Sequence, residues 1–147
     1  MLPWHSISIF TTIAWIIMFS GAALSSAAKA AEGETPAYPW DLKQSAPTAY
    51  QSYLKILPPS SKNINWVGRL RGTGQAIETI SLDGKRYLSG FICKPHACDL
   101  NHIAFLIEVD GSRAIALLKS TETKGRVVEL GNPSASEVKY LREQMVN

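Results

Sequence analysis

Two Asp-Gly pairs set between extended apolar segments are the feature that most restricts the fold of this chain. Each pair separates two runs rich in apolar and β-branched residues: 76–82 and 85–92 around Asp83-Gly84, and 102–109 and 112–119 around Asp110-Gly111. Asp-Gly is typical of tight hairpin turns, because these turns need positive φ angles that glycine adopts at little cost. The four segments are therefore predicted to form two antiparallel β-hairpins.

The flanking segments predict more strands and two helices. INWVGRL at 64–70 is predicted to be the first strand, and 127–130 a short edge strand. Residues 45–57 have apolar positions at helical spacing, with Pro47 in the first turn and Pro58-Pro59 ending the helix. Ser134 and Glu137 form a capping box that begins a final helix. The predicted fold is α+β: an antiparallel meander sheet of about five strands, covered by N- and C-terminal helices.

The first thirty residues differ from the rest. ISIFTTIAWIIMFSGAAL at 7–24 is almost entirely apolar, and Ala28-Lys29-Ala30 matches the A-x-A cleavage pattern of a secretory signal peptide. We expect export, cleavage near Ala30 and a single mature domain at 31–147. The alternative is a membrane anchor, since about 18 apolar residues can span a bilayer. Residues 31–44 are expected to be a loose lead-in from which Trp40 docks on the domain.

Composition and the spread of charged residues argue against several functions. Without the first thirty residues the chain has 14 Lys+Arg and 12 Asp+Glu and no long basic run, so a nucleic-acid partner is not expected. No triad spacing, phosphate loop or metal cluster appears, and the GTG at 72–74 is interpreted as a bend. The acids of the mature part are scattered: Asp83, Glu108, Asp110, Glu122 and Glu129. We therefore predict neither an enzyme nor a bound cofactor.

Both cysteines lie between the two predicted hairpins, at the rim of the sheet. Cys93 and Cys98 enclose four residues, Lys94 to Ala97, and two close cysteines in an exported protein favour a disulfide. A zinc site formed by Cys93, His96, Cys98 and His102 is the alternative, but it needs reduced thiols. The disulfide would fix the loop ends and Pro95 would fix one φ, which leaves His96 preorganised at the tip.

The chemistry of the tip suits an acidic cleft. Lys94 and His96 are both hydrogen-bond donors, and a histidine can gain a proton at mildly acidic pH. The alternative is a plain structural staple whose histidine points at water.

The loop CKPHAC, which follows an Asp-Gly hairpin and a strand in a short exported α+β domain, resembles the Ivy family, the inhibitors of vertebrate lysozyme of Gram-negative bacteria. The family's loop is usually CKPHDC, and the segment WVGRLRG fits the same layout. The resemblance implies a periplasmic protein that inhibits c-type lysozyme by inserting the stapled loop into the catalytic cleft. There His96 would meet the catalytic carboxylates, Lys94 would bind neighbouring acceptors and Pro95 would shape the tip.

Ala97 departs from this pattern, because the family usually has an aspartate there that could brace the loop or orient the histidine. Asp99, two positions on, is a potential substitute. Two other functions stay open: control of the cell's own lytic transglycosylases, and a structural binding protein of the envelope with no muramidase target. The resemblance also implies a homodimer, for which an exposed sheet edge is a plausible contact.

Overall fold

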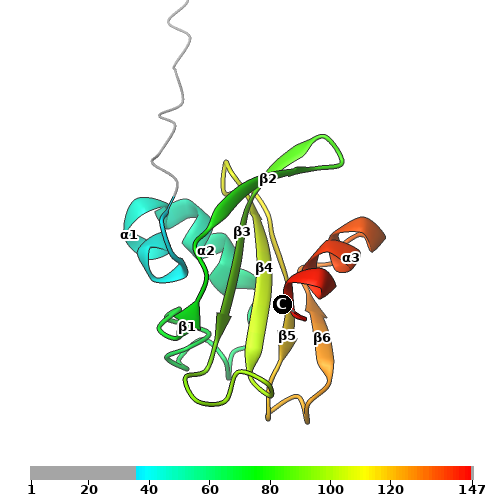
Figure 1. Ribbon diagram of the computed structural model, residues 1–147. Helices are drawn as coiled ribbons and strands as arrows, with labels where there is room; N and C mark the ends of the chain where they lie inside the picture. Colours follow the sequence, from blue (N-terminus) through cyan, green and yellow to red (C-terminus); the bar gives the residue numbers. More distant parts are fainter. Residues whose placement is uncertain (1–35, 147) are drawn as a thin grey trace, which may run out of the picture. The chain divides into compact units, whose positions relative to one another are not determined.

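An antiparallel sheet runs through the centre of the structure, a computed structural model that describes residues 36–146 (Figure 1). Within these residues the sheet has six strands: β1 Thr73–Gly74, β2 Glu78–Leu82, β3 Lys85–Cys93, β4 His102–Glu108, β5 Ala114–Lys119 and β6 Val127–Leu130. Strands β2 to β6 follow one another as a meander, and β1 pairs with the far end of β3. The predicted α+β meander is confirmed. The signal peptide or anchor predicted for residues 1–30 lies outside the described residues.

Both Asp-Gly pairs form turns, as predicted. Leu82 pairs with Lys85, so Asp83 and Gly84 alone close the first hairpin, with φ angles of 51° and 75°. Two successive positive φ angles are the mark of a type I′ turn, whose twist matches that of the strands. The second hairpin is looser. There Gly111, at φ 74°, donates its N–H to the carbonyl of Glu108 over 2.7 Å.

The two central strands are held in register by seven residue pairs, from Tyr87 opposite Glu108 to Cys93 opposite His102. Gly90 lies directly opposite Phe105, and a Cβ added at Gly90 would lie 2.2 Å from the Phe105 ring. The phenylalanine ring therefore occupies the space that any other residue at position 90 would need. This contact fits only one alignment of β3 against β4.

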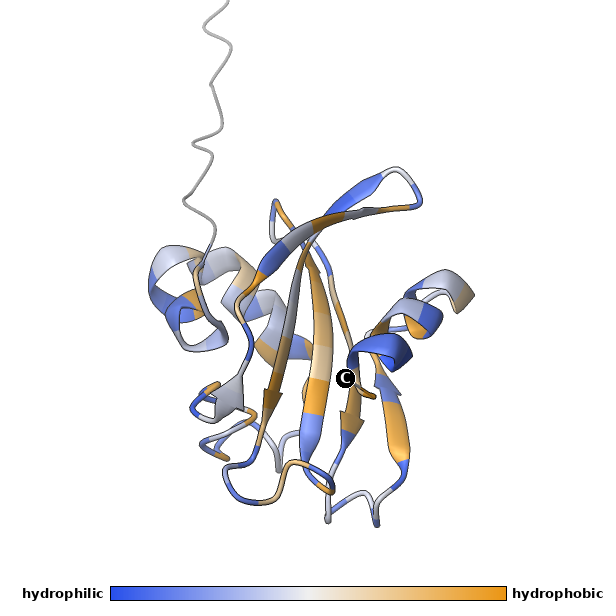
Figure 2. Cartoon of the chain, in the orientation of Figure 1, coloured by the Kyte–Doolittle hydropathy of each residue, from blue (hydrophilic) through white to orange (hydrophobic). Residues whose placement is uncertain are grey.

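Helices cover both faces of the sheet. On one side, α1 (Leu42–Ser45) and α2 (Pro47–Ile56) pack over one set of alternating strand residues, which includes Leu88, Ile103 and Phe105. On the other side, α3 (Ala135–Gln144) packs over the second set. The central strands are accordingly apolar over most of their length (Figure 2). Among residues 36–146 no helix is long and apolar enough to cross a membrane.

The prediction of a strand at residues 64–70 is wrong. This segment is a series of turns, and the first strand is the two-residue β1 in the GTG that was interpreted as a bend. The carbonyls of Val67 and Gly68 accept hydrogen bonds from the hydroxyls of Tyr53 and Tyr50, both over 2.8 Å. Leu70 has a φ of 51°, which no strand allows. Trp66, Val67 and Leu70 are buried and Ile64 is half-buried, but α2 rather than the sheet binds the backbone of the segment.

The lead-in is more ordered than predicted. It contains the 3₁₀ helix η1 (Pro39–Asp41) followed by α1, and the predicted helix 45–57 begins at Pro47 and ends at Ile56. Trp40 does not enter the core: its ring stacks on Tyr38 with centroids 4.7 Å apart, and it stays 43% exposed. Residue Ile77 donates its N–H to the carbonyl of Ala37 over 3.0 Å, so this segment covers part of the sheet edge.

A buried ionic cluster fixes α3 to the sheet. Ser134 and Glu137 form the predicted capping box, and the Glu137 carboxylate also accepts from the Tyr87 hydroxyl over 2.7 Å. Arg113 binds the same carboxylate through both terminal nitrogens, over 2.6 and 3.0 Å. These bonds, with Arg113 foremost, lower the pKa of Glu137 to about 2, and burial with the Glu137 contact raises the pKa of Tyr87 to about 12. The carboxylate is therefore ionised in the folded protein well below the pH at which a free glutamate takes up a proton.

We predict that Glu137→Gln lowers the free energy of unfolding by about 3 kcal/mol at pH 7. Glutamine keeps a capping group at this position but removes the ion-pair partner of Arg113, which then binds only the carbonyl of Asn132 and a neutral amide. The pKa of Glu137 is depressed in the folded state, so its contribution is complete above the ordinary value of 4.5 and is lost as the pH falls towards about 2. Urea unfolding between pH 7 and pH 2 should therefore show a weaker pH dependence in the variant. The exposed Glu129→Gln, which removes the same charge outside the cluster, is the control and should be as stable as wild type at pH 7.

Candidate functional site

The six residues from Cys93 to Cys98 form a closed turn at the end of the two central strands. A disulfide joins the two cysteines, and Cys93 is also paired with His102 across the strands. Lys94 donates its N–H to the carbonyl of Asn101 over 2.9 Å, which extends the ladder by one step. Ala97 then donates to the carbonyl of Lys94 over 3.0 Å. The chain thus reverses over four residues, Lys94 to Ala97, with both ends anchored.

The geometry of this turn explains the order Pro-His. Proline is favoured at the second position of a type II turn, and the third position needs a positive φ. Pro95 and His96 occupy those positions, and His96 has a φ of 63°. This conformation is uncommon for a residue with a side chain, although histidine adopts it more often than most. A backbone held in a rarely populated region is a reason to look for function at that residue.

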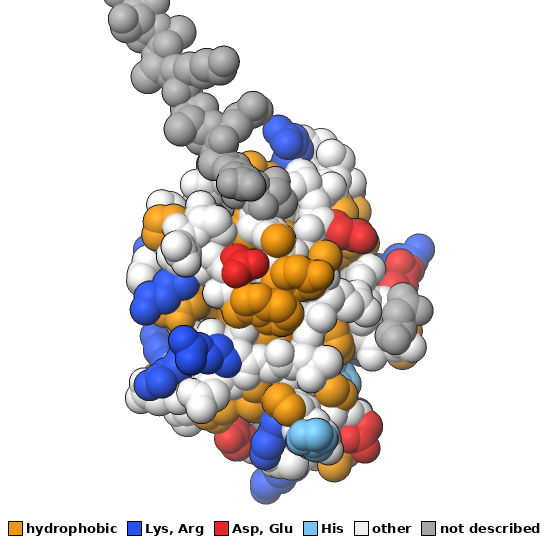
Figure 3. Space-filling view, turned by 60° about the vertical axis from the view of Figure 1, so that its left-hand side comes forward, with side chains coloured by type: hydrophobic (Ala, Val, Ile, Leu, Met, Phe, Trp, Pro, Cys, Tyr) orange, Lys and Arg blue, Asp and Glu red, His pale blue; other side chains and the backbone are white. Residues whose placement is uncertain are grey.

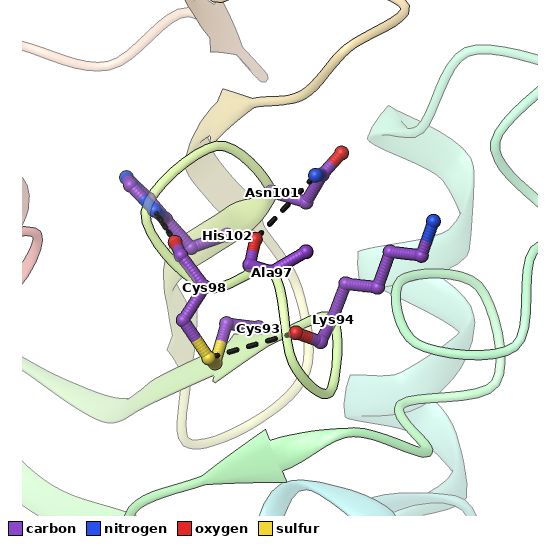
Figure 4. Close-up of a disulfide and its surroundings, with 6 residues drawn as sticks. All are labelled: Cys93, Lys94, Ala97, Cys98, Asn101 and His102. Atoms are coloured by element: carbon purple, nitrogen blue, oxygen red, sulfur yellow. Dashed lines mark hydrogen bonds between the residues drawn. A yellow bond between two sulfur atoms is a disulfide. The ribbon is translucent and has the colours of Figure 1, made fainter.

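The side chains of the turn point outward. Lys94, Pro95 and His96 are all exposed, and the imidazole of His96 has no hydrogen-bond partner among residues 36–146. Figure 4 shows the Lys94 side chain extending away from the two sulfur atoms. A hollow of about 460 Å³ lies beside the disulfide, lined by Phe91, His102, Lys119 and Met145 among others, but residues 94–97 do not line it. The tip is a convex projection rather than the wall of a pocket.

Asn101 braces the turn from inside, a role that was not predicted from the sequence. Its side chain is buried, and its amide nitrogen lies 3.4 Å from the Ala97 carbonyl, to which its backbone N–H also donates over 3.0 Å. The amide oxygen accepts from the N–H and hydroxyl of Thr121 over 3.1 and 3.3 Å. Asn101 thus links the turn to the loop that follows β5. A lone asparagine before a strand is a common turn residue, so the sequence carried little signal for this role.

The two histidines near the cysteines differ in their surroundings. His102 is buried, its ring contacts Phe91, and its Nδ1 lies 2.6 Å from the carbonyl of Cys98 (Figure 4). A carbonyl can only accept, so Nδ1 carries the proton in this contact. His102 therefore has a structural role in holding the end of the loop. Of the two, His96 is the one whose side chain is exposed.

The position that departs from the expected motif is stabilised by other means. Ala97 is half-buried, and its carbonyl receives both hydrogen bonds from Asn101, so the turn is braced without an aspartate side chain. Asp99, considered as a substitute, has an exposed side chain, and only its backbone carbonyl is engaged, by the Lys119 ammonium over 3.0 Å. The Cys98 sulfur lies 3.6 Å from the Lys94 carbonyl, a contact without a proton because the sulfur is in the disulfide.

The remaining polar side chains are arranged for structure. The disulfide occupies both sulfurs that the zinc alternative needed, and no three potential metal ligands gather within residues 36–146. Glu108 binds Lys85 and Ser112, and these contacts lower its pKa. Asp110 accepts from the Ser112 N–H, which lowers its pKa too. These acids stabilise the ends of the hairpin.

Comparison with known protein families identifies the family of the chain. The family model described as "Inhibitor of vertebrate lysozyme (Ivy)" matches residues 50–141, which is more than half of the chain. The matched region runs from α2 into α3 and includes the whole cysteine loop. No curated protein matches the chain.

We predict that His96→Gly leaves the protein as stable as wild type or raises its free energy of unfolding by up to about 1 kcal/mol. Glycine adopts a positive φ without the steric penalty of a Cβ, which offsets its larger entropy in the unfolded chain. Thermal and urea unfolding of the oxidised proteins would measure this. His96→Val is the contrasting variant, because a β-branched residue should destabilise the same turn. A clear loss of stability in His96→Gly would mean that the imidazole supports the fold.

Proposed function

Since the chain belongs to the family of inhibitors of vertebrate lysozyme (Ivy), we propose that it inhibits a c-type lysozyme by inserting the loop Cys93–Cys98 into the catalytic cleft, with His96 as the key contact. The observation that carries this proposal is the exposed His96 on a turn closed by the disulfide. A side chain presented in this way loses little conformational freedom on binding, and such preorganisation favours tight inhibition.

The chemistry of the target fits a histidine probe. Retaining glycosidases use two carboxyl groups about 5–5.5 Å apart, one kept protonated by its surroundings and one ionised. An imidazolium carries N–H donors on opposite sides of the ring. Placed between the two carboxyl groups, His96 could bind both and exclude the substrate. Lys94, exposed beside it, would reach acceptors at the cleft wall, and Pro95 would keep the tip narrow.

Export to the periplasm is part of this proposal. The apolar segment at 7–24 and the Ala28-Lys29-Ala30 pattern support a cleaved signal peptide, and the closed cysteine pair suits an oxidising compartment. There the protein would protect peptidoglycan from incoming lysozyme. Ala97 is the observation that favours a second target, the cell's own lytic transglycosylases, which cleave the same glycan with a catalytic carboxylate. A changed residue directly after the exposed tip suggests a changed cleft.

The test is inhibition of cell-wall hydrolysis by residues 31–147, oxidised, titrated against a c-type lysozyme. We expect near-stoichiometric inhibition by wild type. His96→Asn should inhibit at least about a hundredfold more weakly, since two buried charge-assisted hydrogen bonds to the target would be lost. Asparagine tolerates the positive φ, so this variant keeps the turn. Lys43→Ala, exposed in α1, is the matched surface control and should inhibit as wild type does.

Three outcomes bear on the proposal differently. Equal inhibition by wild type and His96→Asn would show that another surface makes the contact. Inhibition that survives reduction of the disulfide would show that the closed loop is not needed. No effect on lysozyme, but His96-dependent inhibition of a lytic transglycosylase, would support the second target.

A further inference from the structure

The basic residues of the described chain are unevenly distributed. Three segments, 58–72, 94–101 and 119–126, contain seven Lys or Arg and two Asp or Glu, a balance of +5. All other residues from 36 to 146 contain seven basic and eight acidic residues, a balance of −1. We call the three segments together the basic end. The small net charge of the chain therefore conceals a strong polarity.

Contacts between the three segments gather them at the end of the sheet that carries the cysteine loop. Gly72 lies so close to Cys93 that a Cβ added to it would be 2.2 Å from the Cys93 carbonyl oxygen. On the other side, Thr121 binds Asn101, and Lys119 binds the carbonyl of Asp99. Figure 1 shows the loops 94–101 and 120–126 at the same end of the sheet. In Figure 3, basic side chains lie to the left of and below an exposed histidine, and acidic side chains lie on either side of it.

The cations of the basic end are not neutralised within the described part of the chain. The ion pairs found in residues 36–146 are Lys85–Glu108 and Arg113–Glu137, both outside the basic end. Six of its seven basic residues are exposed, and Lys119, which binds the Asp99 carbonyl, is half-buried. Like charges gathered in this way repel one another and contribute nothing to folding. A partner of opposite charge would relieve this repulsion.

We infer that the basic end is a docking surface for a muramidase whose catalytic cleft is rimmed by carboxylates, and that it steers the His96 loop into that cleft. This inference rests on the proposed function and adds the electrostatic character of the target. Opposite potentials raise the rate of diffusional encounter by tenfold or more and fix the orientation of approach. The effect is screened by salt, because the Debye length falls from about 30 Å at 0.01 M to about 8 Å at 0.15 M.

The test compares two double variants with the same change of net charge. The basic-end variant, Arg71→Glu with Lys124→Glu, reverses one charge on each side of the loop. The α1/α2 variant, Lys43→Glu with Lys55→Glu, reverses one charge in each of these two helices. All four residues are exposed. The association rate constant of each oxidised protein is measured by inhibition progress curves at about 0.01 M and 0.15 M salt. The probes are a c-type lysozyme and a soluble lytic transglycosylase, chosen so that only one of them has an acidic cleft rim.

We expect wild type to associate with the acidic-rim enzyme about tenfold faster at low salt than at high salt. The association rate constant of the basic-end variant should be about tenfold lower than that of wild type at low salt and little changed at high salt. The rate constant of the α1/α2 variant should stay within about twofold of wild type. The enzyme without an acidic rim should bind wild type more slowly, and its association rate constant should not differ between wild type and the basic-end variant or between low and high salt.

Equal slowing by both double variants would overturn the inference, because net charge alone would then act. A second outcome combines two results: association rate constants that neither salt nor either double variant changes, and inhibition that His96→Asn abolishes. It would overturn the inference of a docking surface and leave the proposed function standing. Failure of wild type to inhibit either enzyme would overturn both.

Discussion

The alignment of β3 against β4 is the constraint on which the rest of the structure depends. Both strands are covered on two faces, so a shift by one residue would exchange every side chain between two different cores. The Phe105 ring over Gly90 fits only the observed register. That register places Cys93 opposite His102, so the two chain ends of the loop leave the sheet side by side. The short disulfide loop and its exposed tip follow from this pairing.

Stability and recognition are placed in different parts of the molecule. The ionic cluster of Glu137, Arg113 and Tyr87 holds α3 at the hairpin end of β3 and β5, while the loop projects from the opposite end. The loop is braced by backbone bonds, the disulfide and Asn101, none of which uses the side chains of Lys94 or His96. Residues that would contact a target can therefore vary without unfolding the domain. The substitution of Ala97 for the aspartate usual in the family fits this separation.

Much of the fold could be predicted because its signals are local. Asp83-Gly84, the capping box of Ser134 and Glu137, and the helix that begins at Pro47 each depend on neighbours within four residues, and all are present. The segment 64–70 was predicted wrongly because its apolar pattern indicates burial but not which backbone partner it has. That partner is a pair of tyrosine hydroxyls on α2. The role of Asn101 was missed for the same reason, since its partners lie in two different loops.

The sequence alone determined the two hairpins, the short spacing of the cysteines and the identity of the tip residues, since these follow from turn chemistry and from neighbours along the chain. Only the tertiary structure decided that His96 is exposed on a left-handed backbone while His102 is buried against Phe91. It also decided that basic residues far apart in the chain gather around the tip. Burial and electrostatic potential are sums over neighbours in space, and strand pairing brings together neighbours that the order of residues does not reveal.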